Sequence, residues 1–292
     1  MSDRTALPPA PFIVGVGRSG TTLLRLMLDS HPEMCIPPET GFIPAATGRS
    51  RGAAGLRNEF FQTVTQFVTW EDFNLSPEEF FAGLKKIEPF DTSEGIRAFY
   101  RLYTRRFGKP RWGDKTPAYC LQMREIESVL PEARFIHIIR DGRDVALSVR
   151  PLWFAPGKDM TTLALDWQSR VEQTRQSSRR CLHYIEVRYE NLVADAKSEL
   201  KRICVFLDLQ YHARMLRYFE GARARLDEVK TRYRPDGTIL ISKEDRLLNQ
   251  RATSAPPDSS RVFRWKREMT MEERREFEKA AGNLLETLGY DR

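Results

Sequence analysis

The sequence predicts an α/β fold in which one central parallel β-sheet is covered by helices on both faces. Short β-branched apolar runs alternate along the chain with helical stretches, and strands separated by helices of this length favour parallel pairing. With 292 residues, of which 41% are hydrophobic and 11% aromatic, the chain can build one large core. We therefore expect a single three-layer α/β/α domain over residues 1–292, with a mainly helical insertion at about 41–110 and a long loop at about 230–260.

The first strand and the first helix are joined by a glycine loop. Residues 12–16 are a β-branched run, Gly17 to Gly20 follow, and residues 21–30 carry leucines at helical spacing. His31-Pro32 ends this helix, and residues 33–36 can form a second short strand. The unit is therefore βαβ in outline, with parallel strands.

Residues 41–110 contain no clear strand pattern and are mainly helical in composition. Their aromatic side chains can form the core of a helical subdomain, or some of them can line a pocket for an acceptor beside the sheet. The phenylalanines concerned are Phe60, Phe61, Phe67, Phe73, Phe80, Phe81, Phe90, Phe99 and Phe107.

Strands and helices alternate again after residue 110. The clearest buried strand is 134–139, and Asp141 can cap a helix that begins at about Arg143. The other expected elements are strands at 111–113 and 183–187 and helices at 119–130, 161–180, 194–207 and 270–288. Residues 230–260 contain Pro235, Gly237, Pro256 and Pro257, which favour a surface loop with little structure of its own.

Composition excludes several classes of protein. The net charge of +7 suggests anionic ligands or partners without choosing among them. No apolar run approaches the roughly 20 residues of a membrane-spanning helix, and residues 1–11 do not form a secretory signal, so we expect a cytoplasmic protein. The scattered cysteines and histidines show no metal-ligand spacing, and no recognised nucleic-acid-binding motif is present.

The loop from Gly17 to Thr22 is a candidate cradle for a phosphate or sulfate group. A glycine loop between a buried strand and a helix presents backbone N–H groups and the positive end of the helix dipole to an anion. Arg18 adds a permanent cation, and the hydroxyls of Thr21 and Thr22 can donate further hydrogen bonds. The loop is not a Walker A motif, because the four-residue spacer and the Gly-Lys-Ser/Thr ending are absent. The plainer interpretation is a tight turn with an exposed arginine.

A second candidate site residue, Arg140, follows the strand 134–139. In phosphotransferases with a P-loop, this position normally holds the aspartate that organises Mg²⁺. An arginine here could instead bind a second anionic group of the ligand, and Ser148 on the following helix could assist it. The alternatives are a surface salt bridge of Arg140 with Asp141 or Asp144 and a solvent-facing Ser148.

These motifs resemble those of sulfotransferases that use 3′-phosphoadenosine 5′-phosphosulfate (PAPS), and the pattern is nearest to the tyrosylprotein sulfotransferase branch. Residues 11–32 resemble the 5′-phosphosulfate loop of that family, and residues 134–148 resemble its 3′-phosphate motif. The resemblance extends through the segments Pro38-Glu39-Thr40, Asp114-Lys115-Thr116-Pro117 and Val187 to Val193. It implies a P-loop-like fold and sulfuryl transfer from PAPS, with adenosine 3′,5′-bisphosphate as the product and no metal ion.

The resemblance also implies a role for each matching residue. Glu39 would be the general base, and Lys115 would reach the transferring sulfuryl group together with Arg18. The donor nucleotide would be held by Arg18, Ser19, Gly20, Thr21, Thr22, Arg140, Ser148 and Tyr189, and a short C-terminal match adds Arg264 and Lys266. Gly17 stands where the family often has a proline. The tyrosylprotein enzymes carry a membrane anchor, and we expect none here, so the acceptor hydroxyl stays open between a small molecule, a glycan and a peptide. A homodimer is also left open.

Elementary geometry agrees with these roles, because the carboxyl ends of parallel strands share one edge of a sheet. The glycine loop, Glu39, Lys115, Arg140 and Tyr189 all follow predicted strands and should meet there. Glu39 could otherwise be a first-turn glutamate that balances Arg18, and Lys115 could be a structural partner of Asp114. The rival functions are a P-loop kinase acting on a small molecule and a non-enzymatic nucleic-acid binder.

Overall fold

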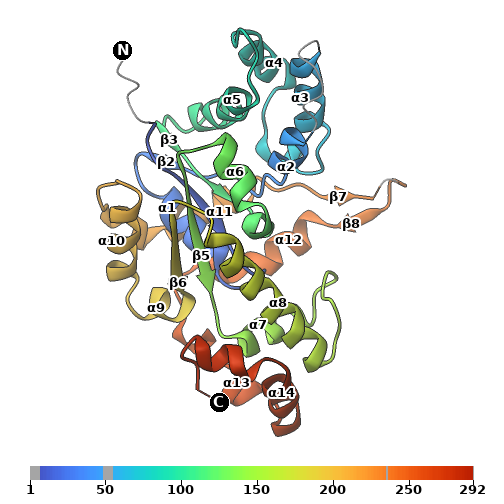
Figure 1. Cartoon of the computed structure of the whole chain (residues 1–292), viewed down its shortest axis with the longest axis vertical. Coiled ribbons are helices and arrows are strands. Elements are labelled where there is room, and N and C mark those ends of the chain that lie inside the picture. The colour runs from blue at the N-terminus through green and yellow to red at the C-terminus, as the bar shows by residue number, and fades with distance from the viewer. Residues whose placement is uncertain (1–6, 49–54, 235, 292) are drawn as a thin grey trace.

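The centre of the molecule is a parallel sheet of four strands in the order β4-β1-β5-β6 (Figure 1). The computed structural model describes residues 7–48, 55–234 and 236–291. Residues 1–6 and 292 of the expected domain, 49–54 of the expected insertion and Pro235 of the expected loop therefore lie outside the described residues. The strands are β1 (Ala10–Val14), β4 (Asp114–Lys115), β5 (Ala133–Ile139) and β6 (Tyr184–Arg188). The predicted α/β class with a central parallel sheet is confirmed.

Two further short strands, β2 and β3, form a small parallel sheet next to the β4 edge of the main sheet. β2 (Met34–Cys35) pairs in parallel with β3 (Arg111–Trp112), and Gly113 separates β3 from β4, which pairs with β1. A Cβ atom on Gly113 would lie 2.6 Å from Pro11, so only glycine permits this close approach to β1. The predicted βαβ unit therefore has parallel strands, but the segment 111–115 lies between them and they are not neighbours.

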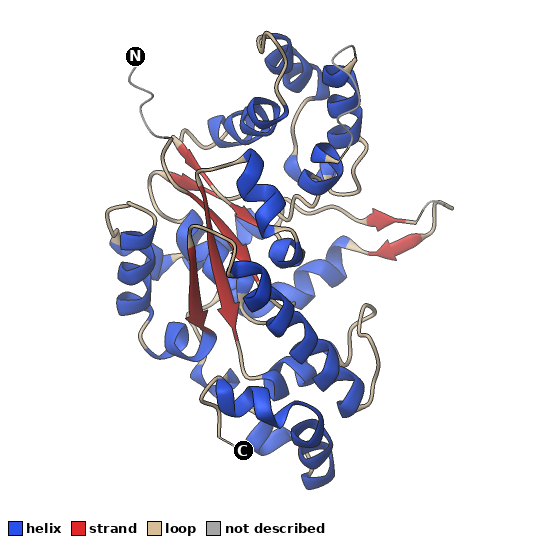
Figure 2. Cartoon of the chain, in the orientation of Figure 1, coloured by secondary structure: helices blue, strands red, loops and turns tan. Residues whose placement is uncertain are grey.

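Helices cover both faces of the sheet (Figure 2). Side chains of a strand alternate between the two faces, and apolar residues on both faces need to be buried. Ile13 and Ile136 face α1 (Thr21–Asp29) and α10 (Ala196–Phe206). Phe12 and Phe135 face the opposite side, where they join the core that includes α6 (Met123–Val129). The remaining helices of this core region are η2 (Pro117–Leu121), α7 (Gly142–Val149), α8 (Met160–Ser178), α9 (Tyr189–Ala194), η3 (Ala213–Arg217), α11 (Phe219–Leu226) and α14 (Met271–Thr287).

The segment 41–110 is helical where the structure describes it, as the sequence predicts. Its elements are α2 (Ile43–Thr47), α3 (Leu56–Thr65), η1 (Trp70–Phe73), α4 (Pro77–Lys85) and α5 (Thr92–Arg105). All ten phenylalanines of this segment, the nine named above and Phe42, belong to one hydrophobic core that continues onto the sheet through Phe12 and Phe135. None of them lines the main cavity of the molecule, which supports the core interpretation over the pocket one.

The prediction that residues 230–260 form a long loop with little structure is wrong. The segment contains an antiparallel hairpin of β7 (Arg232–Tyr233) and β8 (Ile239–Ile241), which projects from the body in Figure 1, followed by α12 (Lys243–Gln250). Asp236-Gly237 forms the hairpin turn, and the Ser242 side chain caps α12. Short elements complete the chain before α14: η4 (Arg251–Ser254), η5 (Ser259–Arg261) and α13 (Trp265–Glu268). Among the described residues, no helix has the length and apolarity to cross a bilayer.

Candidate active site

The glycine loop leads from the carboxyl end of β1 into the first turn of α1. Gly20 precedes the helix with a left-handed φ of 100°, and a Cβ atom there would lie 2.4 Å from the ring of Tyr189. Only glycine meets both conditions, so the loop rests directly on Tyr189. Ser19, Thr21 and Thr22 are buried around the start of α1. The N–H of Ser19 donates to the carbonyl of Val16 (3.2 Å), whereas the first N–H groups of α1 have no partner within the helix and could bind an anion.

Arg18 lies inside a group of arginines. Its backbone has a φ of 71°, and its Nη2 donates to the carbonyl of Asn249 in α12 (2.9 Å). Burial lowers the pKa of Arg18, and the neighbouring charges of Arg140, Arg261 and Arg264 lower it further. Several guanidinium groups from distant parts of the sequence thus share one region, and their repulsion favours an anion there.

Arg140 stands at the carboxyl end of β5 and connects the two predicted nucleotide motifs. Its Nη1 lies 3.3 Å from the carbonyl oxygen of Arg18, and its Nη2 donates to the carbonyl of Arg261 (2.6 Å). Its guanidinium lies 4.5 Å from the centre of the Tyr189 ring and forms a salt bridge with Asp144 (3.3 Å). The predicted pair with Asp144 therefore exists, but Arg140 also reaches the glycine loop, so one ligand can contact both.

The C-terminal segment supplies Arg264 to this region but not Lys266. Arg264 Nη2 donates to the hydroxyl of Ser148 on α7 (3.0 Å), and the next backbone N–H, of Trp265, donates to Asp144 (3.0 Å). Lys266 lies on the outside of α13 near Asp291 (3.9 Å), and it does not line the cavity. Because residues 265–268 are helical, consecutive side chains diverge, so the expected role of Lys266 is not supported by its position.

Glu39 and Lys115 form a direct ion pair. Lys115 Nζ lies 2.6 Å from Glu39 Oε1, with the lysine buried and the glutamate partly exposed. Burial acts to raise the pKa of Glu39, but the charge and hydrogen bond of Lys115 outweigh it, with help from Arg232 and Arg246, so the pKa lies below its usual range. Burial lowers the pKa of Lys115. The alternative pairing of Lys115 with Asp114, and that of Glu39 with Arg18, are not what the structure shows.

Asp114 has a separate role in holding the two segments of this pair together. It is fully buried and accepts hydrogen bonds from the hydroxyls of Thr40 (2.7 Å) and Tyr100 (2.8 Å). Burial raises its pKa to about 6. Thr40 follows Glu39 and also donates its backbone N–H to Thr116 (3.0 Å), so the segments that carry Glu39 and Lys115 are held together by both residues.

The predicted site residues line one cavity of about 490 Å³. Arg18, Glu39, Lys115, Arg140 and Tyr189 are all in its wall, which confirms that the glycine loop, Glu39 and the strand ends meet at one edge of the sheet. Gly20, Thr21, Thr22 and Ser148 also line it, whereas Ser19, Arg264 and Lys266 do not. Further wall residues were not predicted: Arg25, Leu152, Trp153, Phe154, Arg170, Arg232, Arg246, Leu247, Asn249 and Arg261.

Three buried polar groups in and beside the glycine loop are suited to an anionic ligand. The hydroxyl of Ser19 and the Nε atoms of Arg18 and Arg140 are buried and have no hydrogen-bond partner among the described residues. Buried donors without partners are costly, and an anion would satisfy them. The residues present therefore fit a donor with two anionic groups, one at the glycine loop and one between Arg140 and Ser148.

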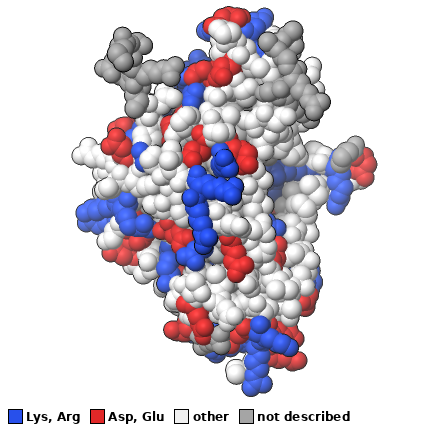
Figure 3. All heavy atoms as spheres, in the orientation of Figure 1, with Lys and Arg blue, Asp and Glu red and all other residues white. Residues whose placement is uncertain are grey.

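Two further observations concern the surface charge on one face and possible metal sites. On the face seen in Figure 3, Lys and Arg are interspersed with Asp and Glu and do not form one continuous basic area. In the described part of the chain, no group of three or more His, Cys, Asp or Glu side chains could hold a metal ion.

Comparison of the sequence with known proteins points to one family. The profile of the Sulfotransferase family matches residues 9–213. A putative protein-tyrosine sulfotransferase of Caenorhabditis briggsae is 29% identical, over 74% of this chain and 71% of the relative. The nodulation protein NoeE of Sinorhizobium fredii is 28% identical over 99% of this chain and 68% of that protein. The protein-tyrosine sulfotransferase of Drosophila melanogaster is 25% identical over 97% of this chain, which spans about half (52%) of that relative.

Solved structures agree on the fold. The sulfotransferase domain of the Synechococcus PCC 7002 olefin synthase superposes with a TM-score of 0.57 at 22% identity, over 100% of this chain and 98% of that one. The sulfotransferase domain of the curacin biosynthetic pathway also gives 0.57, at 18% identity, over 98% and 99% of the two chains. Since the family profile covers more than half of its residues, including the glycine loop, Glu39, Lys115 and Arg140, this chain belongs to the sulfotransferase family.

Proposed function

We propose that the chain transfers the sulfuryl group of PAPS to a hydroxyl group of an acceptor, with Glu39 as the general base. The observation that carries the proposal is the meeting of Arg18, Arg140, Lys115 and Glu39 in one cavity, with Arg140 within hydrogen-bond range of the glycine loop. PAPS carries anionic groups at both ends of its ribose, and the two groups of buried donors match them. When bound, PAPS supplies the activated sulfuryl group.

The donor would be held at two places. The loop N–H groups, Ser19, Thr21 and Thr22 would bind the 5′-phosphosulfate at the start of α1. Arg140 would bind the 3′-phosphate with Ser148, whose hydroxyl Arg264 already orients. This leaves the Glu39–Lys115 pair beside the reacting end.

Glu39 and Lys115 would do the chemistry as a pair. In sulfuryl transfer, as in phosphoryl transfer, fixed positive charge stabilises an in-line transition state, and Lys115 with Arg18 supplies that charge. Glu39 is ionised at neutral pH because Lys115 holds its pKa low, so it can accept the proton of the acceptor hydroxyl. A sulfuryl oxygen that competes for Lys115 would loosen the ion pair and make Glu39 a stronger base.

The acceptor is a hydroxyl compound. Several relatives are named as protein-tyrosine sulfotransferases, which makes a tyrosine phenol the first class to test, ahead of alcohols and glycans. The cavity wall contributed by Leu152, Trp153 and Phe154 suits an acceptor with an aromatic or apolar part.

Calorimetry and label transfer test the proposal. Adenosine 3′,5′-bisphosphate should bind far more tightly than ATP·Mg²⁺, since the latter lacks a 3′-phosphate. With ³⁵S-labelled PAPS, a tyrosine peptide, 4-nitrophenol and N-acetylglucosamine should be compared as acceptors. Tighter binding of ATP·Mg²⁺ would refute the donor assignment, and full activity of Glu39→Gln on the best acceptor would place the base elsewhere.

A further inference from the structure

We infer that Asp72, a carboxylate of the helical insertion, is a positioning residue of the active site that holds Arg246 and Arg232 beside Glu39. The inference rests on the proposed role of Glu39 as the base. Asp72 does not line the cavity itself and acts through the two arginines, which do.

The hydrogen bonds that the Asp72 carboxylate accepts all come from residues 230–246. Its carboxylate is buried (2% exposed) and receives both terminal nitrogens of Arg246, at 2.8 Å on Oδ1 and 2.7 Å on Oδ2. It also accepts from the backbone N–H of Lys230 (2.8 Å) and from Arg232 Nη2 (3.2 Å). Arg246 in turn donates to the carbonyl of Lys230 (2.6 Å). A two-pronged arginine–carboxylate pair of this kind fixes orientation as well as distance.

The segment that carries Asp72 is itself held firmly in the insertion. Its neighbours Trp70 and Phe73 are buried in the aromatic core of the insertion. The hydroxyl of Thr69 donates to the carbonyl of Thr40 (2.6 Å), the residue that follows Glu39. The turn that carries Asp72 is therefore bonded to the backbone next to Glu39. Through Asp72 it is also bonded to Arg232 and Arg246, which face Glu39.

The segment that bears the arginines buries little side-chain surface. α12 contains no buried side chain, and the side chains of the β7–β8 hairpin are exposed or only partly buried. Segments with so little buried apolar surface open at low free energy. Besides Asp72, residues 230–250 are held by the Arg18–Asn249 hydrogen bond (2.9 Å), the Lys243–Asp227 ion pair (2.9 Å) and the partly buried Leu247. The Asp72 contacts are the ones that hold the two arginines.

The charged groups that face Glu39 are Lys115 from β4, Arg232 from β7 and Arg246 from α12. Burial acts to raise the pKa of Glu39 and all three cations act to lower it. If Asp72 is lost, Arg246 and Arg232 are free to move into solvent, and the pKa of Glu39 should rise. Removal of the charge of Asp72 without arginine movement would have the opposite sign, so the direction of the shift reveals whether Asp72 acts by position.

The test uses Asp72→Asn, Arg246→Gln and the double variant. A matched control is Glu132→Gln, which breaks another buried pair with the insertion, Arg97–Glu132 (2.6 Å), away from the cavity. The pKa of Glu39 would be followed by NMR on ¹³C-glutamate-labelled protein without ligands, with Glu39→Gln for assignment. Limited trypsin digestion would report the opening of residues 230–250.

We expect both single variants to raise the pKa of Glu39, the double variant to add nothing to the larger single effect, and Glu132→Gln to leave the pKa unchanged. Cleavage within residues 230–250 should accelerate about tenfold in Asp72→Asn, because proteolysis follows the open population. An unchanged or lowered pKa in Asp72→Asn, or fully additive effects, would overturn the inference.

If Asp72→Asn does not fold, the pKa of Glu39 in Arg246→Lys tests the inference instead. Lysine keeps the charge but cannot form the two-pronged contact, so the pKa of Glu39 must still rise if position matters. No donor or acceptor enters this measurement. Failure of the inference is therefore distinct from failure of the proposed function, which would show as an active Glu39→Gln enzyme.

Discussion

Replacing Arg140 with alanine should weaken the nucleotide through its 3′-phosphate alone. The guanidinium of Arg140 is held by the carbonyls of Arg18 and Arg261 and by Asp144, and it lies over the ring of Tyr189, so little ordering is needed when it meets a phosphate. A hydrogen bond to a charged group contributes roughly 1.5–3 kcal/mol. At about 1.4 kcal/mol per factor of ten, the dissociation constant of adenosine 3′,5′-bisphosphate should rise about 10- to 150-fold.

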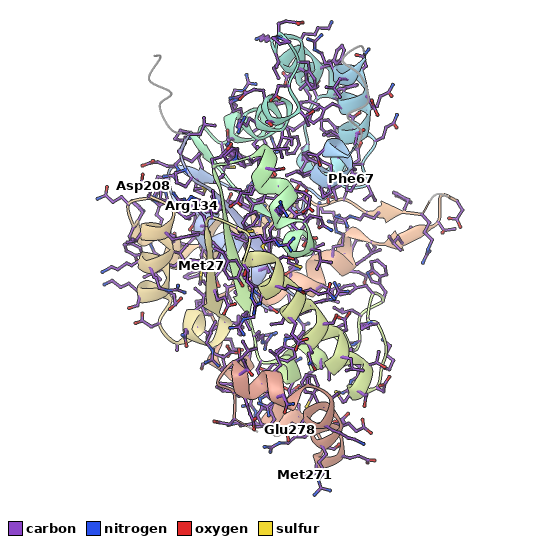
Figure 4. The ribbon with its side chains drawn as sticks, in the orientation of Figure 1. Met27, Phe67, Arg134, Asp208, Met271 and Glu278 are labelled. Atoms are coloured by element: carbon purple, nitrogen blue, oxygen red, sulfur yellow. The ribbon has the colours of Figure 1, made fainter. Side chains whose placement is uncertain are left out.

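The assay is isothermal titration calorimetry with two ligands, adenosine 3′,5′-bisphosphate and adenosine 5′-monophosphate. Wild-type protein should prefer the bisphosphate, and Arg140→Ala should lose most of that preference while its affinity for the monophosphate changes little. Arg134→Ala is the matched control, since Arg134, labelled in Figure 4, lies at the opposite end of the same strand, where it contacts His183 (3.0 Å). Equal losses for both ligands in Arg140→Ala would show that Arg140 does not bind the 3′-phosphate.

Four further substitutions test catalysis, loop geometry and stability separately. Glu39→Gln should keep the affinity for adenosine 3′,5′-bisphosphate and reduce turnover by about 10²- to 10⁴-fold in the ³⁵S transfer assay. In the wild type, activity should fall only as the pH drops through the lowered pKa of Glu39, because the carboxylate is the active form. Gly20→Ala should destabilise the fold by more than the roughly 1–2 kcal/mol of a left-handed non-glycine residue, since its Cβ would also clash with Tyr189. Gly17→Ala, with nothing within 4 Å of a Cβ, should be nearly neutral in urea unfolding. The pKa of Asp114 is raised to about 6, so the folded state binds the extra proton and stability should fall as the pH rises from about 4 to 6, by up to roughly 3 kcal/mol. In Asp114→Asn, the urea-unfolding midpoint should no longer fall between pH 4 and 6. An unchanged pH dependence of the midpoint would mean that Asp114 ionises normally.

The features that local sequence predicts best are those fixed by neighbours in the chain. The apolar run before Gly17, the helix after Gly20 and the buried strand before Arg140 each have a local pattern, and the edge of a parallel sheet then brings their ends together. The predicted first strand is shifted, because β1 ends at Val14. The helix after β5 begins at Gly142 with Asp141 as its cap, as expected.

The features that sequence reasoning missed depend on contacts between distant segments. Arg232 and Arg246 look like solvated charges in a weakly patterned stretch, and only Asp72, 160 and 174 positions away, gives them a place in the cavity wall. The hairpin itself was missed because two- and three-residue strands carry almost no alternation signal. Lys266 was misplaced for a related reason: a short basic match does not reveal on which side of a helical turn each side chain lies.

The arginines around the glycine loop explain how the donor affinity proposed above could be built into the fold. Arg18 and Arg264 both have pKa values lowered by burial, with contributions from neighbouring arginines, so crowding these cations costs free energy. Backbone carbonyls of Asn249 and Arg261 and the carboxylate of Asp144 offset part of that cost. A guanidinium has five N–H groups, so these contacts orient Arg18 and Arg140 and still leave each Nε free to donate. An anion would form charge-assisted hydrogen bonds, about twice as strong as neutral ones, and would relieve the repulsion at the same time. Both carbonyls belong to residues 249–261, beyond the part of the chain that the family profile matches, and nucleotide binding should therefore stabilise that C-terminal segment along with the loop.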